Sequence, residues 1–347
     1  MKKYKFLKKT INVKRESLEK MIDACISLPE PTRATVSQYA SVSLVTAGKL
    51  LTALDECRFS QTVYKYTDSG RSIKIHKIND KLTATVIDLS SPYCSVSVIR
   101  GDGSIIFYKK YDYPTGVSMK EGVLAALSRV CLEIKSLDLP VSAICTILAD
   151  EEDGAAASSV LRPRDKDWLE SIIGKLFGIT PTVQLTLCEA LTSAAKFCRL
   201  PTAQNKSMAY IHTGGDVKLY VLPQNSSPVI CRPCDLMISD RMTVSDALEE
   251  MNSPSSFAKL LARVVNLAHS SVSPQEYVIE YDSAKFGGKA LHEINKSFAL
   301  LAREAPVIYS RDHHSSVTHL GAAAKATSEF IKLYITTTCK QKTSEDS

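Results

Sequence analysis

A repeated order of strands and helices in residues 81–339 constrains the fold of this 347-residue chain more than any other feature. Apolar runs bounded by turn residues predict buried strands, and apolar residues at helical spacing predict amphipathic helices. The first copy has three strands, a helix, a strand and two helices, at 85–89, 94–99, 104–108, 123–134, 141–148, 168–177 and 189–198. The second copy has two strands, a helix and a strand, at 208–211, 217–222, 260–268 and 277–279. This duplication predicts two α/β lobes around a cleft, at residues 81–200 and 201–339.

Residues 1–80 predict a separate winged helix-turn-helix domain. Apolar positions between Leu18 and Ile26 follow one helical face, and Thr32 caps a second helix at 33–39. Ser43 caps a third helix, whose inward residues we expect to include Val45, Leu50, Leu51 and Leu54. Two alternating segments, at 62–66 and 72–78, flank a turn cluster and predict a β-hairpin, the wing.

The positive charge of the chain is concentrated in this first domain. Residues 1–80 contain 15 Lys and Arg against 8 Asp and Glu, a net charge of +7. Residues 81–347 contain the other 28 Lys and Arg and 29 Asp and Glu, a net charge of −1. This asymmetry predicts a polyanionic partner, double-stranded DNA. We expect base edges to be faced by Ser43, Leu44, Thr46 and Lys49, and phosphates or a minor groove to be met by Arg71, Lys74 and Lys77.

Two other interpretations of the first domain stay open: a helical bundle with solvated lysines, and a winged helix that contacts protein. The third helix carries no outward Arg, Asn or Gln, which favours backbone binding over base readout. The basic start, Lys2 to Lys9, predicts either a DNA-touching arm or a solubilising end.

Composition excludes several other classes of protein. No apolar run approaches the ~18 residues that a bilayer crossing needs. The ten cysteines occur mostly singly in apolar segments, as reduced core residues do, so we expect a cytoplasmic protein without membrane contact. The polar residues 340–347 predict a disordered tail.

No metal site or cofactor is expected either. Cys231 and Cys234 lack the second pair of ligands that structural zinc requires. His314 and His319 are spaced poorly for one helical face.

Across nearly the whole chain the sequence resembles the ROK family, in particular its xylose and N-acetylglucosamine repressors. The third helix, Val42 to Leu54, matches the family's L-S-x-x-T-V-S-x-x-V-x-x-L segment except at Ala47 and Gly48. The other matching segments are the I-D-x-G-G-T phosphate loop at 87–92, the F-G-x-P-V…N-D-A segment at 176–190, the second phosphate loop at 212–216, the D-P-x-x-I-V-L-G-G strand at 273–281 and the L-G-A-A segment at 320–323. The resemblance implies a winged helix-turn-helix followed by a two-lobed actin-like, sugar-kinase (ribonuclease H-like) ATPase fold.

Departures from the family pattern predict that the chain is not an enzyme. A loop that closes on phosphate needs glycines, and this chain has Ser90-Ser91-Pro92 instead. In the second loop His212 and Asp216 replace glycines, and Asp216 places a negative charge where phosphate lies. Glu280-Tyr281 replaces the adenosine-side Gly-Gly. The family's sugar segment and zinc loop have no counterpart.

The resemblance also implies a ligand cleft formed by Asp88, Glu189, Thr213 and Gly214. Glu189 stands where the kinases carry their catalytic Asp, but a carboxylate at a helix start is also favoured by the helix dipole alone. Asp88 is expected to serve mainly a local turn with the Ser90 and Ser91 N–H groups.

The sequence as a whole predicts a DNA-binding transcriptional regulator with a catalytically inactive sugar-kinase-like body. That body would serve for homodimerisation and for sensing a sugar or sugar-phosphate effector. The alternatives are a divergent sugar kinase and a pseudokinase scaffold whose winged helix binds protein.

Overall fold

The computed structural model describes residues 15–68, 70–91, 93–150, 161–197 and 317–345, together with short stretches between 208 and 312. The chain divides into two compact units, Met1–Cys198 with His319–Ser347, and Arg199–Thr318. The segment from His319 therefore belongs to the first unit, whereas the sequence grouped residues 319–339 with the second lobe. No helix in the described ranges is long and apolar enough to span a bilayer.

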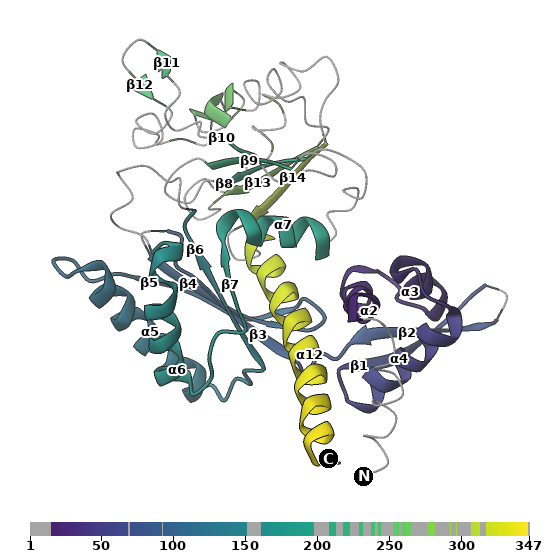
Figure 1. Cartoon of the computed structure of the whole chain (residues 1–347). Helices are drawn as coiled ribbons and strands as arrows, with labels where there is room; N and C mark the ends of the chain where they lie inside the picture. Colours follow the sequence, from purple (N-terminus) through teal and green to yellow (C-terminus); the bar gives the residue numbers. More distant parts are fainter. Residues whose placement is uncertain are drawn as a thin grey trace. The chain divides into compact units, whose positions relative to one another are not determined.

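The N-terminal head, defined here as residues 15–80, consists of three helices followed by a two-stranded antiparallel sheet (Figure 1). Its elements are α2 (Arg15–Ser27), α3 (Arg33–Ala40), α4 (Leu44–Glu56), β1 (Ser60–Tyr66) and β2 (Ser72–Ile78). The two predicted caps are confirmed: the side chain of Thr32 accepts a hydrogen bond from Thr35 N, and that of Ser43 from Thr46 N. Between α3 and α4 the chain reverses through Ser41, which has a left-handed conformation at φ 53°.

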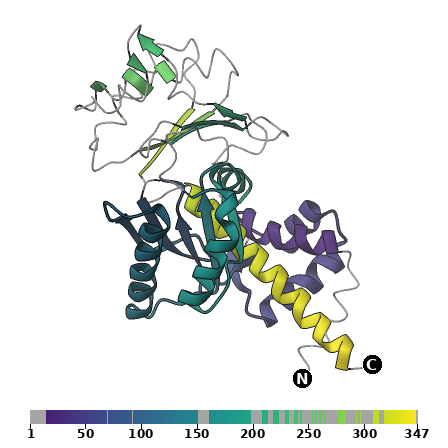
Figure 2. The same ribbon diagram turned by 60° about the vertical axis from the view of Figure 1, so that its left-hand side comes forward.

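The apolar core of the head is completed by the C-terminal helix α12 (Val317–Glu345). Met21, Leu50 and Phe59 of the head lie in one buried cluster with Ile331 and Ile335 of α12. Both views show α12 running alongside the head (Figures 1 and 2). Polar groups add to this packing, because the buried Asp23 carboxylate accepts a hydrogen bond from Ser328 Oγ at 2.7 Å. Lys332 Nζ lies 3.1 Å from the same carboxylate.

One predicted core position of the head is wrong. Val45 is 57% exposed, whereas Ala47, Leu50, Leu51 and Leu54 are buried. Those four residues set the apolar stripe of α4, and Val45 lies about 200° around the helix from Ala47, on the opposite side.

The first body sheet has the strand order β5-β4-β3-β6-β7. Its strands are β3 (Thr83–Asp88), β4 (Tyr93–Arg100), β5 (Ile105–Asp112), β6 (Ala143–Leu148) and β7 (Val183–Thr186). The helices of this lobe are α5 (Met119–Ser136), the short η2 (Pro163–Asp165), α6 (Lys166–Phe177) and α7 (Leu187–Phe197). One sheet face packs on α5 and α6 in a single apolar cluster that includes Ile87, Val123 and Leu169. The opposite face carries the polar contacts with α12 that are described below.

The second unit repeats this topology, with the strand order β10-β9-β8-β13-β14. Its strands are β8 (Met208–His212), β9 (Lys218–Leu222), β10 (Val229–Cys231), β13 (Glu276–Tyr281) and β14 (Val307–Asp312), with a separate pair β11 (Met237–Ser239) and β12 (Met242–Thr243). In each five-stranded sheet three antiparallel strands are followed by two parallel ones. The predicted duplication is therefore confirmed.

The end of the chain differs from its expected disorder. α12 continues as far as Glu345, so residues 340–345 of the predicted tail are helical. No Gly or Pro interrupts the sequence between Ala322 and Glu345, as a continuous helix requires.

Candidate nucleic-acid interface

The two polar residues at the start of α4 use their hydroxyl groups within the helix cap. Ser43 Oγ accepts a hydrogen bond from Thr46 N at 3.1 Å and lies 2.9 Å from Thr46 Oγ1. Further along the helix, Thr52 Oγ1 donates to the Gly48 carbonyl at 2.9 Å. The cap therefore occupies the groups of Ser43 and Thr46 that the sequence assigned to base edges.

Arg33 of α3 crosses onto α4 at the place where α4 has a glycine. Its Nε donates a hydrogen bond to the Leu44 carbonyl at 2.6 Å. A Cβ on Gly48 would approach Arg33 Nε to 2.8 Å, closer than real Cβ contacts come. Gly48, a departure from the family pattern, thus leaves room for a guanidinium that sequence reasoning missed. A glycine inside a helix that otherwise lacks one was the available signal.

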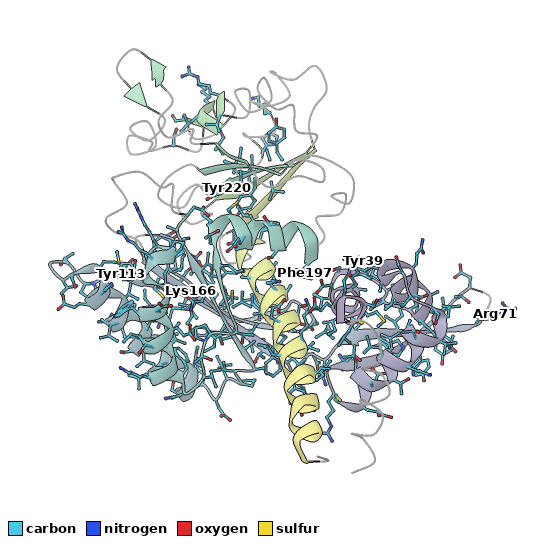
Figure 3. The ribbon with its side chains drawn as sticks, in the orientation of Figure 1. Tyr39, Arg71, Tyr113, Lys166, Phe197 and Tyr220 are labelled. Carbon is cyan, nitrogen blue, oxygen red and sulfur yellow. The ribbon has the colours of Figure 1, made fainter. Side chains whose placement is uncertain are left out.

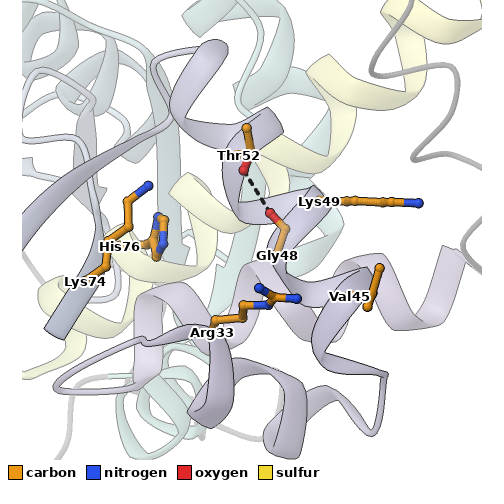
Figure 4. Close-up of a pocket in the computed structure, with 7 residues that line it drawn as sticks. All are labelled: Arg33, Val45, Gly48, Lys49, Thr52, Lys74 and His76. Carbon is orange, nitrogen blue, oxygen red and sulfur yellow. Dashed lines mark hydrogen bonds between the residues drawn. The ribbon is translucent and has the colours of Figure 1, made fainter.

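Arg33 lies on a pocket of about 420 Å³ on this surface (Figure 4). The pocket is lined by Arg33, Val45, Gly48, Lys49, Thr52, Lys74 and His76. The structure thus brings the predicted residues Lys49 and Lys74 together, one from α4 and one from β2. No carboxylate lies among these lining residues, which include one cationic residue each from α3, α4 and β2. We call this cavity the head pocket.

A buried polar network supports the floor of the head pocket. His76 is 4% exposed, and its Nδ1 lies 3.0 Å from Asp55 Oδ2, which also accepts a hydrogen bond from Thr62 Oγ1 at 2.8 Å. Burial alone would raise the pKa of the Asp55 carboxyl, but the hydrogen bonds from His76, Ser60 and Thr62 and the nearby imidazole outweigh burial and lower it. The carboxylate therefore stays ionised and fixes the orientation of the His76 ring.

The hairpin extends the basic surface away from the pocket. Arg71 lies at the tip of the hairpin, at the far edge of the head (Figure 3). Lys74 and Lys77 are exposed along β2. Two large aromatic side chains, Tyr64 and Tyr66, are 60% and 74% exposed on β1. The hairpin therefore exposes both cations and aromatic rings.

In the body, the position of the first phosphate loop is occupied by the protein's own side chains. Asp88 Oδ1 accepts hydrogen bonds from Ser90 N at 2.9 Å and Ser90 Oγ at 2.7 Å, which confirms the predicted turn for Ser90. His319 of α12 lies 3.4 Å from Asp88 Oδ2 and also contacts Ser95 and Ser97 of β4.

These contacts make Asp88 and His319 a buried polar pair. Both residues are almost fully buried, at 7% and 2% exposure. Burial by itself raises the pKa of the Asp88 carboxyl, but hydrogen bonding and charge from His319, with the Ser90 hydrogen bonds, outweigh it and lower that pKa. His319 joins α12 to this loop; no spacing in the sequence pointed to that role.

Glu189 and a neighbouring aspartate secure the start of α7. Glu189 Oε2 accepts a hydrogen bond from Thr186 N at 2.8 Å, and Thr186 Oγ1 accepts one from Glu189 N at 3.2 Å. This reciprocal pair is a capping box. Asp150, buried just after β6, accepts a hydrogen bond from Cys188 N at 3.2 Å, and sequence reasoning missed it.

The remaining predicted site residues cannot be placed beside these groups. Thr213 and Gly214, like Asp216, Cys234, His313 and His314, lie outside the described residues. Among the residues that are described, no three His, Cys, Asp or Glu side chains form a group able to hold a metal ion.

Comparison with known proteins identifies the fold. No family model and no curated protein matches the sequence. Among solved structures, a ROK family transcriptional regulator described as a homologue of the E. coli MLC protein is 12% identical, with a TM-score of 0.62, covering 92% of this chain and 98% of its own.

Two sugar kinases are also similar to this chain. An inorganic polyphosphate/ATP-glucomannokinase from Arthrobacter sp. strain KM is 13% identical, with a TM-score of 0.50, covering 71% of this chain and 98% of its own. A ROK family glucokinase from Streptomyces griseus, in complex with glucose and AMPPNP, is 13% identical, with a TM-score of 0.50. The similarity covers 70% of this chain and 99% of the glucokinase. The chain thus has an N-terminal helical region joined to the actin-like fold of ROK family sugar kinases and regulators.

Proposed function

We propose that this chain is a DNA-binding transcriptional regulator whose sugar-kinase-like body does not transfer phosphate. The observation that carries the proposal is the head pocket, where Arg33, Lys49 and Lys74 face one cavity without an acidic lining residue. Cations gathered on one face are the expected footprint of a protein that binds a phosphate backbone. The head is then a winged helix-turn-helix, with α4 in the major groove and the hairpin on the adjacent backbone.

The extent of the structural similarity supports the same assignment. The regulator covers 92% of this chain, whereas the two kinases cover 70–71%. The difference is about a fifth of the chain, which is the size of the head.

The hydrogen bonds within the first phosphate loop, residues 87–92, support the proposal that the body does not transfer phosphate. A loop that cradles phosphate presents free backbone N–H groups to the ligand. In this chain Ser90 N is directed to the Asp88 carboxylate, which is also paired with His319. The Ser90 N–H is therefore not free for a phosphate, and Pro92 has no N–H to offer one.

The body is proposed to mediate dimerisation and to bind an effector. The glucokinase of similar fold was solved with glucose, so a sugar or sugar phosphate is the class of effector we propose for this chain. Ligand binding would favour one arrangement of the body and so one spacing of the two heads on DNA.

DNA binding is tested with the purified full chain and a random-sequence duplex library. We expect enrichment of a defined, palindrome-like site, with an affinity that falls steeply as salt increases. Lys49→Ala should weaken binding and lower the salt slope by about 1, because one phosphate contact is lost. Lys166→Ala, an exposed lysine of the body, is the matched control (Figure 3). Affinity that is independent of salt, or no enrichment over random DNA, would refute the proposal and favour a scaffold that binds protein.

Catalysis is tested separately with ATP and a panel of hexoses and amino sugars. We expect no turnover above background. Turnover that Glu189→Gln abolishes would instead establish a sugar kinase, since glutamine keeps the helix cap and removes only the carboxylate.

A further inference from the structure

The exposed start of α4 carries two large apolar side chains where DNA readers usually carry polar ones. Leu44 is 53% exposed and Val45 is 57% exposed, at the first two positions of the helix. Leu44 and Val45 have no role in the head core, whose members on α4 are Ala47, Leu50, Leu51, Ala53 and Leu54. Such exposure has an energetic cost in water that a partner would relieve.

Polar readout by this part of α4 is restricted by the cap. The hydroxyls of Ser43 and Thr46 bond to each other and to the backbone, so turning them to a base would uncap the helix. In α4, all of which the structure describes, Lys49 is the one charged side chain in the first two turns. The surface therefore has little capacity to read bases by hydrogen bonds.

The surroundings of Val45 indicate what would cover it. Val45 lines the head pocket with Arg33 and Lys49, so its methyl groups lie beside two cationic residues (Figure 4). A partner that covers Val45 should therefore place an apolar group against it and negative charge next to that group. B-DNA does both, because thymine displays a 5-methyl group in the major groove beside the backbone phosphates.

We propose that Leu44 and Val45 read thymine methyl groups, so that this regulator selects sites with thymines at the positions facing the start of α4. The inference rests on the proposed function and deepens it, since it assigns base specificity to apolar contact. Cytosine and uracil lack the methyl group, so both should be rejected at these positions. Each lost methyl contact should weaken binding by about fourfold, from about 0.8 kcal/mol per buried methyl-sized group.

The test compares thymine and uracil in an otherwise identical duplex. The site enriched from the random library is remade with deoxyuridine replacing thymidine one position at a time, and its affinity for the full chain is measured by fluorescence anisotropy. We expect about a fourfold loss at one or more positions in each half-site, and no such loss with Leu44→Ser/Val45→Ser, whose short polar side chains remove the apolar contact. Leu132→Ala, an exposed leucine on α5 at 69%, is the matched control and should keep the full discrimination.

The outcomes separate this inference from the proposed function. Equal affinity of the unmodified chain for thymine and uracil duplexes would overturn the methyl contact while leaving DNA binding intact. Discrimination that persists in the double variant would also overturn it. Absence of salt-dependent binding to any duplex would overturn both proposals.

Discussion

Gly48→Ala separates the stability of the head from its affinity for DNA. Alanine in place of glycine inside a helix stabilises the folded state by up to about 1 kcal/mol. At this position the new Cβ would lie 2.8 Å from Arg33 Nε, so the guanidinium must move away from the Leu44 carbonyl. The lost hydrogen bond costs about 1 kcal/mol, which offsets the gain in helix propensity. We therefore expect an unfolding free energy within about 1 kcal/mol of the unmodified chain.

DNA affinity should respond differently from stability. If Arg33 contacts one backbone phosphate, displacing it lowers the salt slope by about 0.9 and the affinity by about fivefold at about 0.15 M salt. Chemical denaturation measures the free energy of unfolding. Anisotropy titrations at several salt concentrations measure the DNA affinity and its salt slope.

Gly174→Ala on α6 supplies the control for this prediction. A Cβ there would meet only Thr180 Cγ2, at an ordinary 3.8 Å. This variant should gain stability and bind DNA unchanged. Equal DNA affinity and salt slope in the Gly48 and Gly174 variants would refute the role given to Arg33.

Three further predictions concern the body and its junction with the head. Gly321→Val should destabilise the first unit strongly, because even a Cβ at this position would lie 2.4 Å from the α7 backbone; thermal unfolding would show a lowered midpoint, and an unchanged one would contradict the close helix crossing. Asp88→Asn should lower stability at neutral pH. The pKa of Asp88 in the folded state lies below its ordinary value. The ionised carboxylate therefore stabilises the folded state fully above about pH 4, and this stabilisation is lost as the pH falls through the folded pKa. Denaturation between about pH 3 and about pH 7 should therefore show the difference between the two proteins shrinking in acid, and a constant difference would argue against the pair with His319. Lys332→Met should cost about 3 kcal/mol, because it removes an ammonium from the buried Asp23 carboxylate; a loss below about 1 kcal/mol in denaturant unfolding would show that the pair is dispensable.

Local signals in the sequence predicted the elements of the head and the duplication of the body. Thr32 and Ser43 begin helices because a hydroxyl in front of an apolar stripe satisfies free backbone N–H groups, a property of a few adjacent residues. The hairpins could be predicted equally well, because turn residues separate two segments of alternating apolar and polar residues. β7 and β14 were missed; each pairs in parallel with a strand separated from it by a long connection, so no hairpin turn marks it in the sequence.

The contacts of the candidate site depend on residues far apart in the chain, which sequence patterns do not reveal. His319 meets Asp88 across more than two hundred residues, and Arg33 reaches α4 only because Gly48 leaves space. Val45 was assigned to the core because its residue type, considered alone, favours burial. Its exposure follows from the phase of the helix, which Leu50 and Leu54 set.

The shared core of the head and α12 has a consequence for how the protein is made. A ribosome releases the head's own three helices and hairpin first, but Ile331 and Ile335 emerge more than two hundred residues later. Until then the nascent head presents an unfilled apolar surface and the Asp23 carboxylate without Lys332. A fragment limited to residues 1–80 would therefore yield a module that lacks part of its own interior. Any mapping of its activity by truncation needs residues 317–345 supplied as well.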